Sequence, residues 1–186
     1  MKKLFAIAVF LMVWSSYSQI KSRNLYINNQ SSLGMDIGEI KSKPTSGTYP
    51  FYISKYTVNG VLTNIHLNPG QSLNLVSPYA STVVARFPFY SPTSVPYINF
   101  WSKTVSATSG GLVASSTLNT IIANAQIFDY MKFQVGPNGG NLGYTIYRPT
   151  SISDVQIVYG TGWVAYCSFT GDGTIDASID ISIYDN

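Results

Sequence analysis

Apolar and polar residues alternate strictly near the end of the chain, over residues 175–184. A period of two places successive side chains on opposite faces of a β-strand. One face of this segment is apolar and the other polar, which is typical of a strand that covers a core and also meets water. The apolar positions are Ile175, Ala177, Ile179, Ile181 and Ile183, and the polar ones are Asp176, Ser178, Asp180, Ser182 and Tyr184.

Turn-forming residues predict three β-hairpins. The first joins a strand over 163–169 to this C-terminal strand through 170–173, where two glycines allow positive φ. The second turns at Asn59-Gly60, because Asn-Gly between apolar β-formers is a strong hairpin signal. The third pairs 127–135 with 142–147. In its first arm we expect Ile127, Met131, Phe133 and Val135 on one face and Phe128, Tyr130, Lys132 and Gln134 on the other.

Shorter apolar segments complete an all-β pattern. We expect further strands over 24–28, 35–40, 73–76, 82–87 and 155–159. Residues 115–127 carry a helical stripe, but Thr, Ile and Asn are indifferent helix formers, so we interpret this segment as a strand.

These strands predict a single antiparallel β-sandwich of roughly ten strands. An outer-membrane β-barrel is the structural alternative. Its strands alternate over about ten residues. Several strands expected here are shorter and prolines interrupt the middle of the chain, so we favour the sandwich.

The first eighteen residues have the pattern of a secretory signal peptide. Lys2 and Lys3 precede an apolar run from Leu4 to Trp14, and small residues stand before a cut at Gln19. The run is shorter than the roughly 20 apolar residues of a spanning helix. We therefore expect residues 1–18 to be cleaved and residues 19–186 to form one secreted domain, extracellular or in the cell envelope.

Charge argues against nucleic acid as a partner. Removing two lysines with the signal peptide from eleven basic residues leaves nine, against eight acidic ones. These nine are scattered along the chain, whereas phosphate binding needs clustered Lys and Arg.

Few side chains could support catalysis or bind a metal. His66, the single histidine, alternates with Ile65 and Leu67, so we expect it on a polar strand face. Cys167 is also single, which excludes an intramolecular disulfide, and it lies on the apolar face of its strand. No G-x-S-x-G motif occurs. We expect a protein with no catalytic residues and no cofactor.

Carboxylates offer weak alternatives. Asp176 and Asp180 share a strand face but are about 13 Å apart, too far to act as a hydrolase pair on their own. A carboxylate distant in sequence could still pair with one of them in the folded protein, and the candidates are Asp154, Asp129 and Glu39. The segment beginning at Asp172 departs from a calcium-loop motif, so we expect no metal there.

Aromatic residues gather in TYPFYISKY (48–56) and FPFYSPTSVPYINFW (87–101). Alternation divides each segment between core and surface. We expect Phe87, Phe89, Ile98 and Phe100 inside. The candidate ligand-binding residues, expected at the surface, are Trp101, Tyr97, Tyr90, Tyr49 and Tyr52. Tyr and Trp combine a rigid apolar ring with a polar tip, which suits recognition of glycans and of interfaces.

Three functions are compatible with this pattern. The one we favour is a non-catalytic module that binds a glycan or a cell-surface polymer, in carbohydrate binding or adhesion. The second is a structural protein of the envelope or matrix that self-associates, because low charge and exposed strand edges favour assembly. The third is a small membrane-active, lytic β-protein, since such proteins also carry interfacial Tyr and Trp. We do not favour membrane contact, because the sequence has no amphipathic insertion segment with long alternation flanked by glycines.

Overall fold

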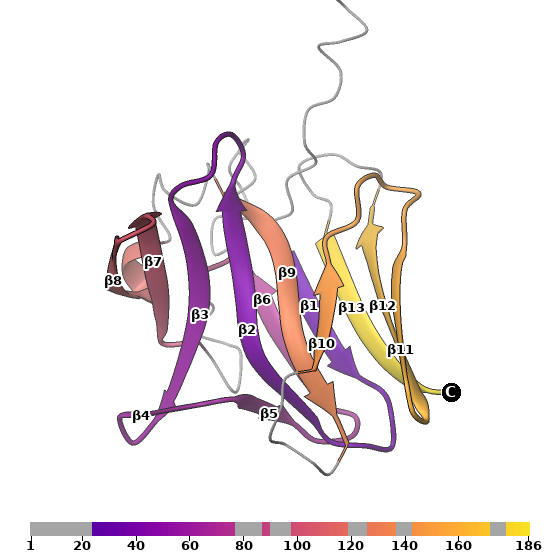
Figure 1. Cartoon of the computed structure of the whole chain (residues 1–186). Coiled ribbons are helices and arrows are strands. Elements are labelled where there is room, and N and C mark those ends of the chain that lie inside the picture. Colours follow the sequence, from indigo (N-terminus) through magenta and orange to yellow (C-terminus); the bar gives the residue numbers. More distant parts are fainter. Residues whose placement is uncertain (1–23, 77–86, 90–97, 119–125, 137–142, 172–177) are drawn as a thin grey trace, which may run out of the picture.

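The protein is an all-β sandwich of two packed sheets (Figure 1). The computed structural model describes residues 24–76, 87–89, 98–118, 126–136, 143–171 and 178–186. The smaller sheet has the order β11-β12-β13-β1-β6. Its strands are β1 (Asn24–Asn29), β6 (Ser72–Val76), β11 (Gln156–Gly160), β12 (Trp163–Thr170) and β13 (Ser178–Asp185). Only β1 and β13 run parallel within it; the other neighbours are antiparallel.

Among the described residues, the larger sheet has eight strands in an antiparallel arrangement. Six follow the order β10-β9-β2-β3-β7-β8, while β4 pairs with β3 and β5 with β2. Their bounds are β2 (Met35–Pro44), β3 (Phe51–Val58), β4 (Val61–Thr63), β5 (Ile65–Leu67), β7 (Phe100–Ser106), β8 (Ser109–Ala114), β9 (Gln126–Val135) and β10 (Tyr144–Tyr147). The sandwich and its largely antiparallel pairing therefore confirm the predicted fold class.

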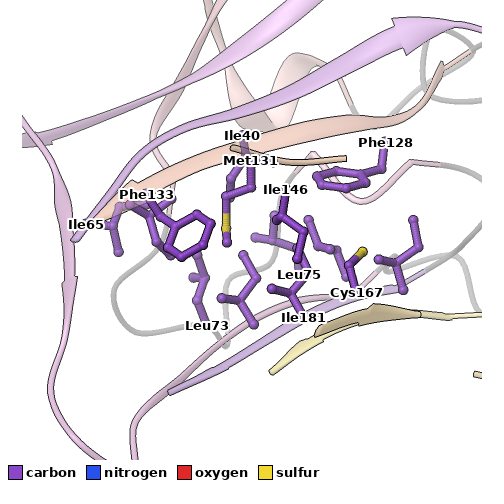
Figure 2. Close-up of a cluster of buried hydrophobic side chains, with 14 of the residues drawn as sticks. Ile40, Ile65, Leu73, Leu75, Phe128, Met131, Phe133, Ile146, Cys167 and Ile181 are labelled. Carbon is purple, nitrogen blue, oxygen red and sulfur yellow. The ribbon is translucent and has the colours of Figure 1, made fainter. Parts of the chain in front are cut away.

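The core lies between the two sheets, where alternate side chains from both interdigitate. Figure 2 shows the middle of this core, with the Cys167 sulfur among aliphatic and aromatic side chains. The larger sheet supplies Ile40, Met131, Phe133 and Ile146, and the smaller supplies Leu73, Leu75, Cys167 and Ile181. Burial raises the pKa of the Cys167 thiol, so the group stays neutral.

The strand pairing of all three predicted hairpins is confirmed, but the tight turn predicted over 170–173 is wrong, because Thr170 still belongs to β12 and pairs with Ser178. β12 pairs with β13, β9 with β10, and β3 with β4. In the last of these, Asn59 and Gly60 both have positive φ, 52° and 78°, as a two-residue hairpin turn requires. The second arm of that hairpin is divided: Val61–Thr63 stays with β3, whereas Ile65–Leu67 moves to β2.

The segment 115–127 differs from the predicted strand. Its first four residues, Ser115–Leu118, form the short helix α2, and β9 begins at Gln126. Ser115 and Leu118 are both buried, a spacing of three that places them on one helix face. Residues 119–125 lie outside the described residues. The predicted strand over 82–87 also lies outside the described residues, except for Phe87, which is buried in irregular structure.

A bulge in β9 changes the predicted faces of its first residues. The register with β2 shifts between Lys41–Tyr130 and Ser42–Phe128, which leaves Asp129 as the extra residue. Ile127 and Phe128 are consequently both buried, and the prediction that Phe128 shares the outer face with Tyr130 is wrong.

Candidate functional site

Trp101 and Tyr52 belong to the core, so their predicted exposure is wrong. Both side chains are fully buried. The Trp101 indole N–H donates a hydrogen bond to the Phe89 carbonyl at 2.9 Å, and its ring packs edge-on against Phe89 and Phe87. Tyr52 meets Phe89 edge-on at 5.1 Å between ring centroids. These four rings form an internal aromatic cluster.

Strand boundaries explain the error at Trp101. The expected alternation assumed an extended strand through 97–101, but β7 begins only at Phe100. The backbone of Asn99 instead accepts a hydrogen bond from the Ser115 N–H. Ile98 and Trp101 consequently both point inward, and Phe100, predicted inside, is exposed.

The error at Tyr52 is an inverted face. Phe51, Ile53 and Lys55 alternate with Tyr52 and Ser54 as expected. The Phe51 side is the outer one, because it carries the Lys55 charge, whereas Tyr52 and Ser54 are buried.

Of the remaining candidates, Tyr49 is exposed as predicted, and Tyr90 and Tyr97 lie outside the described residues. Tyr49 stacks on Phe51 with ring centroids 5.7 Å apart. Phe51 is on the outer face of the larger sheet, so this pair is part of a larger group of side chains on that face.

That surface is a row of aromatic rings and one lysine across four neighbouring strands. On β10 and β9, Tyr147 lies directly opposite Tyr130, and the two rings meet edge-on at 6.0 Å. Tyr130 in turn lies opposite Lys41 on β2. The Lys41 ammonium is 5.0 Å from the Tyr130 ring centroid and 4.6 Å from that of Phe51 on β3. We call Tyr49, Phe51, Lys41, Tyr130 and Tyr147 the aromatic–lysine row.

Ion pairs border the row on both sides. Asp129, which the β9 bulge presents, accepts Lys41 at 3.1 Å and Lys43 at 2.9 Å. Lys132 binds Glu39 at 3.2 Å on the other side of Tyr130. Paired positive and negative groups therefore flank the row, with ammonium groups as donors and carboxylates as acceptors.

Tyr130 is held neutral within this arrangement. Burial, followed by the neighbouring Glu39 carboxylate, raises the pKa of Tyr130 to about 12. Its hydroxyl donates a hydrogen bond to Glu39 at 3.3 Å. The ring therefore stays an uncharged platform up to strongly alkaline pH.

The dimensions of the row suit an extended ligand. Adjacent strands lie about 4.8 Å apart, so the four strands from β10 to β3 spread the row over roughly 14 Å. Aromatic faces contact apolar C–H surface, and the flanking Lys and Asp side chains can bind hydroxyl groups. The row can therefore bind a chain of alternating apolar and hydroxylated surface.

The sequence contained a signal for the row that we missed. In 51–55, Lys55 shares a strand face with Phe51 of the row, and in 39–43, Lys41 and Lys43 share a face with Glu39 beside the row. Lysine is rarely buried, so each lysine identifies the outer face of its strand. Tyr130 and Lys132 were placed together correctly on the polar face of β9, and its pairing with β10 was predicted, but its pairing with β2 was not.

The candidate catalytic groups bind separate partners. His66 is at the surface as predicted, with its Nδ1 2.7 Å from the Asp36 carboxylate on the neighbouring strand. Asp180 accepts hydrogen bonds from Thr170 and Asn28, and Asp154 from Thr150. In the part of the chain that the structure describes, no three His, Cys, Asp or Glu side chains gather as a metal site would need.

Comparison with known proteins adds no assignment. No protein-family model matches the chain, and a search of curated proteins finds no significant match. Within the described residues, no helix has the length and apolar character needed to cross a membrane.

Proposed function

We propose that the protein is an exported, non-catalytic module that binds a glycan of a cell surface or matrix through the aromatic–lysine row. The observation that carries this proposal is the row itself: aromatic rings and paired charges together on one solvent-facing sheet. Sugars present apolar C–H faces and many hydroxyl groups, and the row offers a complementary group for each.

The rigidity of the row supports this proposal. Lys41 is fixed by Asp129 and by two rings, and Tyr130 by Glu39 and Tyr147. Side chains that are already ordered lose little conformational entropy when a ligand binds. The site is therefore organised before the polymer arrives.

Replacing Tyr147 with alanine tests the proposal. The wild-type protein is expected to sediment with at least one insoluble polysaccharide of a panel that spans neutral and acidic polymers. Tyr147 is 58% exposed and has no role in the core. Its loss is expected to weaken retention roughly tenfold, because one aromatic contact contributes about that factor to an affinity.

Tyr159→Ala is the matched control, because Tyr159 is 64% exposed on β11 of the smaller sheet. Retention by this variant is expected to equal that of the wild type. If no polysaccharide retains the protein, or if both variants lose retention equally, the row is not a glycan site.

The edge strand β8 favours self-association as a second function. β8 carries no charge and no proline, its first four residues are exposed, and Leu112 is 64% exposed. Among the described strands, it pairs only with β7. Such an edge can pair with a second copy of itself.

Light scattering against protein concentration tests this second function. Wild-type protein that self-associates should show an apparent mass that rises with concentration, and Leu112→Lys should abolish the rise, because an edge lysine opposes strand pairing. A constant monomer mass for the wild type would exclude assembly through β8.

A further inference from the structure

The β3–β4 hairpin carries an apolar tip that does not pack on the sandwich. All six residues from Val58 to Thr63 are exposed. Val61 is 68% exposed, Leu62 59% and Val58 47%. In Figure 1 the turn between β3 and β4 lies at the lower left corner of the molecule. Val58 is seven residues along β3 from Phe51, about 24 Å at 3.4 Å per residue, and nothing in the proposed function uses the tip.

Apolar side chains occupy both faces of the hairpin. Val58 lies opposite Val61, while Leu62 lies opposite Thr57 on the other face. A protein surface docked on one side would leave either Leu62 or the valine pair in water. An apolar phase that surrounds the tip would cover Leu62 and the valine pair together.

Charge and hydrogen bonding are compatible with such a medium. Residues 56–65 contain no charged side chain. Three backbone pairs join β3 and β4 within the ribbon, from Tyr56–Thr63 to Val58–Val61. The ribbon therefore satisfies part of its own backbone hydrogen bonding, which lowers the cost of leaving water.

One lysine and one aromatic side chain lie side by side near the base of the tip. Lys55 on β3 lies opposite Phe100 on β7, and Phe100 is exposed. Both are about 10 Å along the strand from Val58, three residues at about 3.4 Å each. Aromatic and lysine side chains at this depth are typical of a membrane–water interface, where apolar groups enter about 5–10 Å.

We propose that the β3–β4 tip inserts into a lipid surface and anchors the protein to it, with Lys55 favouring anionic headgroups. The inserted residues are Val58, Val61 and Leu62, and Phe100 lies at headgroup level. The ligand chemistry is that of a phospholipid monolayer, and the contact is peripheral and reversible, because three apolar side chains bury little area.

Vesicle sedimentation tests the anchor. The purified protein is expected to sediment with phosphatidylglycerol–phosphatidylcholine vesicles, and more weakly with phosphatidylcholine alone. Leu62→Asp is expected to reduce the bound fraction at least about tenfold, because it places a charge where the bound protein buries the Leu62 side chain in lipid. Ile157→Asp is the matched control on β11, another exposed apolar residue, and should bind as the wild type does.

A reporter at the tip provides an independent readout. Thr63→Cys can carry an environment-sensitive dye, because Cys167 is buried and poorly reactive. Its emission should shift to the blue with anionic vesicles. Absence of sedimentation together with an unchanged emission would overturn the anchor. So would equal losses in both aspartate variants. Glycan retention by Leu62→Asp is read separately, so either proposal can fail without the other.

Discussion

Replacing Trp101 with alanine is expected to lower the free energy of unfolding by about 3–5 kcal/mol, the usual cost of removing a buried Trp. The indole is fully buried and packs against Phe87 and Phe89. Its removal also leaves the Phe89 carbonyl without the donor it now has. Domains of this size are stable by only about 5–15 kcal/mol, so this loss is a large fraction of the total.

Urea denaturation followed by circular dichroism measures this effect. Trp101→Phe keeps most of the ring volume and loses the N–H, so it is expected to cost roughly 1–3 kcal/mol. Tyr159→Ala, at the surface, should stay within about 0.5 kcal/mol of the wild type. A Trp101→Ala variant that unfolds at the wild-type urea concentration would mean that the indole is outside the core.

Adding one methyl group at Gly160 is expected to cost about 1–3 kcal/mol through overpacking. A Cβ atom on Gly160 would overlap the indole of Trp163, its partner across the β11–β12 hairpin. Trp163 cannot move freely, because its ring packs on Tyr144 at 4.7 Å and on Phe133 at 5.6 Å. It joins β12 of the smaller sheet to β9 and β10 of the larger one, so displacing it disturbs the contact between the two sheets.

Gly111→Ala provides the matched control for this substitution. Gly111 is also within a strand, but a Cβ there meets no atom within 4 Å. The free energy of unfolding of this variant should equal that of the wild type or exceed it slightly, because alanine restricts the unfolded chain. Equal stability of the two variants would contradict the assigned position of Trp163.

Local signals in the sequence predicted most of the strands and the hairpin pairs, but not the pairing of strands distant in sequence. The alternation over 178–184 and the Asn59-Gly60 turn depend on adjacent residues, so β13 and the β3–β4 hairpin could be predicted. β8 was missed because SGGLVA has no period of two. The parallel pairing of β1 with β13 joins the two ends of the domain, and no local pattern encodes it.

The site was harder to predict, because it depends on which strands adjoin. Tyr49 was correctly placed at the surface, but Trp101 and Tyr52 were assigned to the wrong side. Tyr147 and Phe51 are nearly a hundred residues apart in sequence, and they join one row only through the strand order β10-β9-β2-β3. The lysines of these strands could have identified the outer face, because lysine is rarely buried.

The two outer faces of the sandwich differ in chemistry, so the proposal that a glycan binds the aromatic–lysine row predicts binding to one face only. The larger sheet presents Lys41, Lys43 and Lys132 with Asp129 and Glu39. On the smaller sheet Asn24 binds Ser178, and Ser72 binds Asn28, without a lysine among these pairs. A ligand of the row should therefore bind one face and leave the other unchanged.

Backbone amide chemical shifts during titration with an oligosaccharide of the retained polymer test the central claim most directly. Binding at the aromatic–lysine row predicts that the perturbed amides belong to β2, β3, β9 and β10, around Lys41, Phe51, Tyr130 and Tyr147. Amides of β11 and β12 around Tyr159 and Tyr166 should stay unchanged. Perturbation confined to β11–β13, or none at saturating ligand, would contradict the assignment of the row as the glycan site.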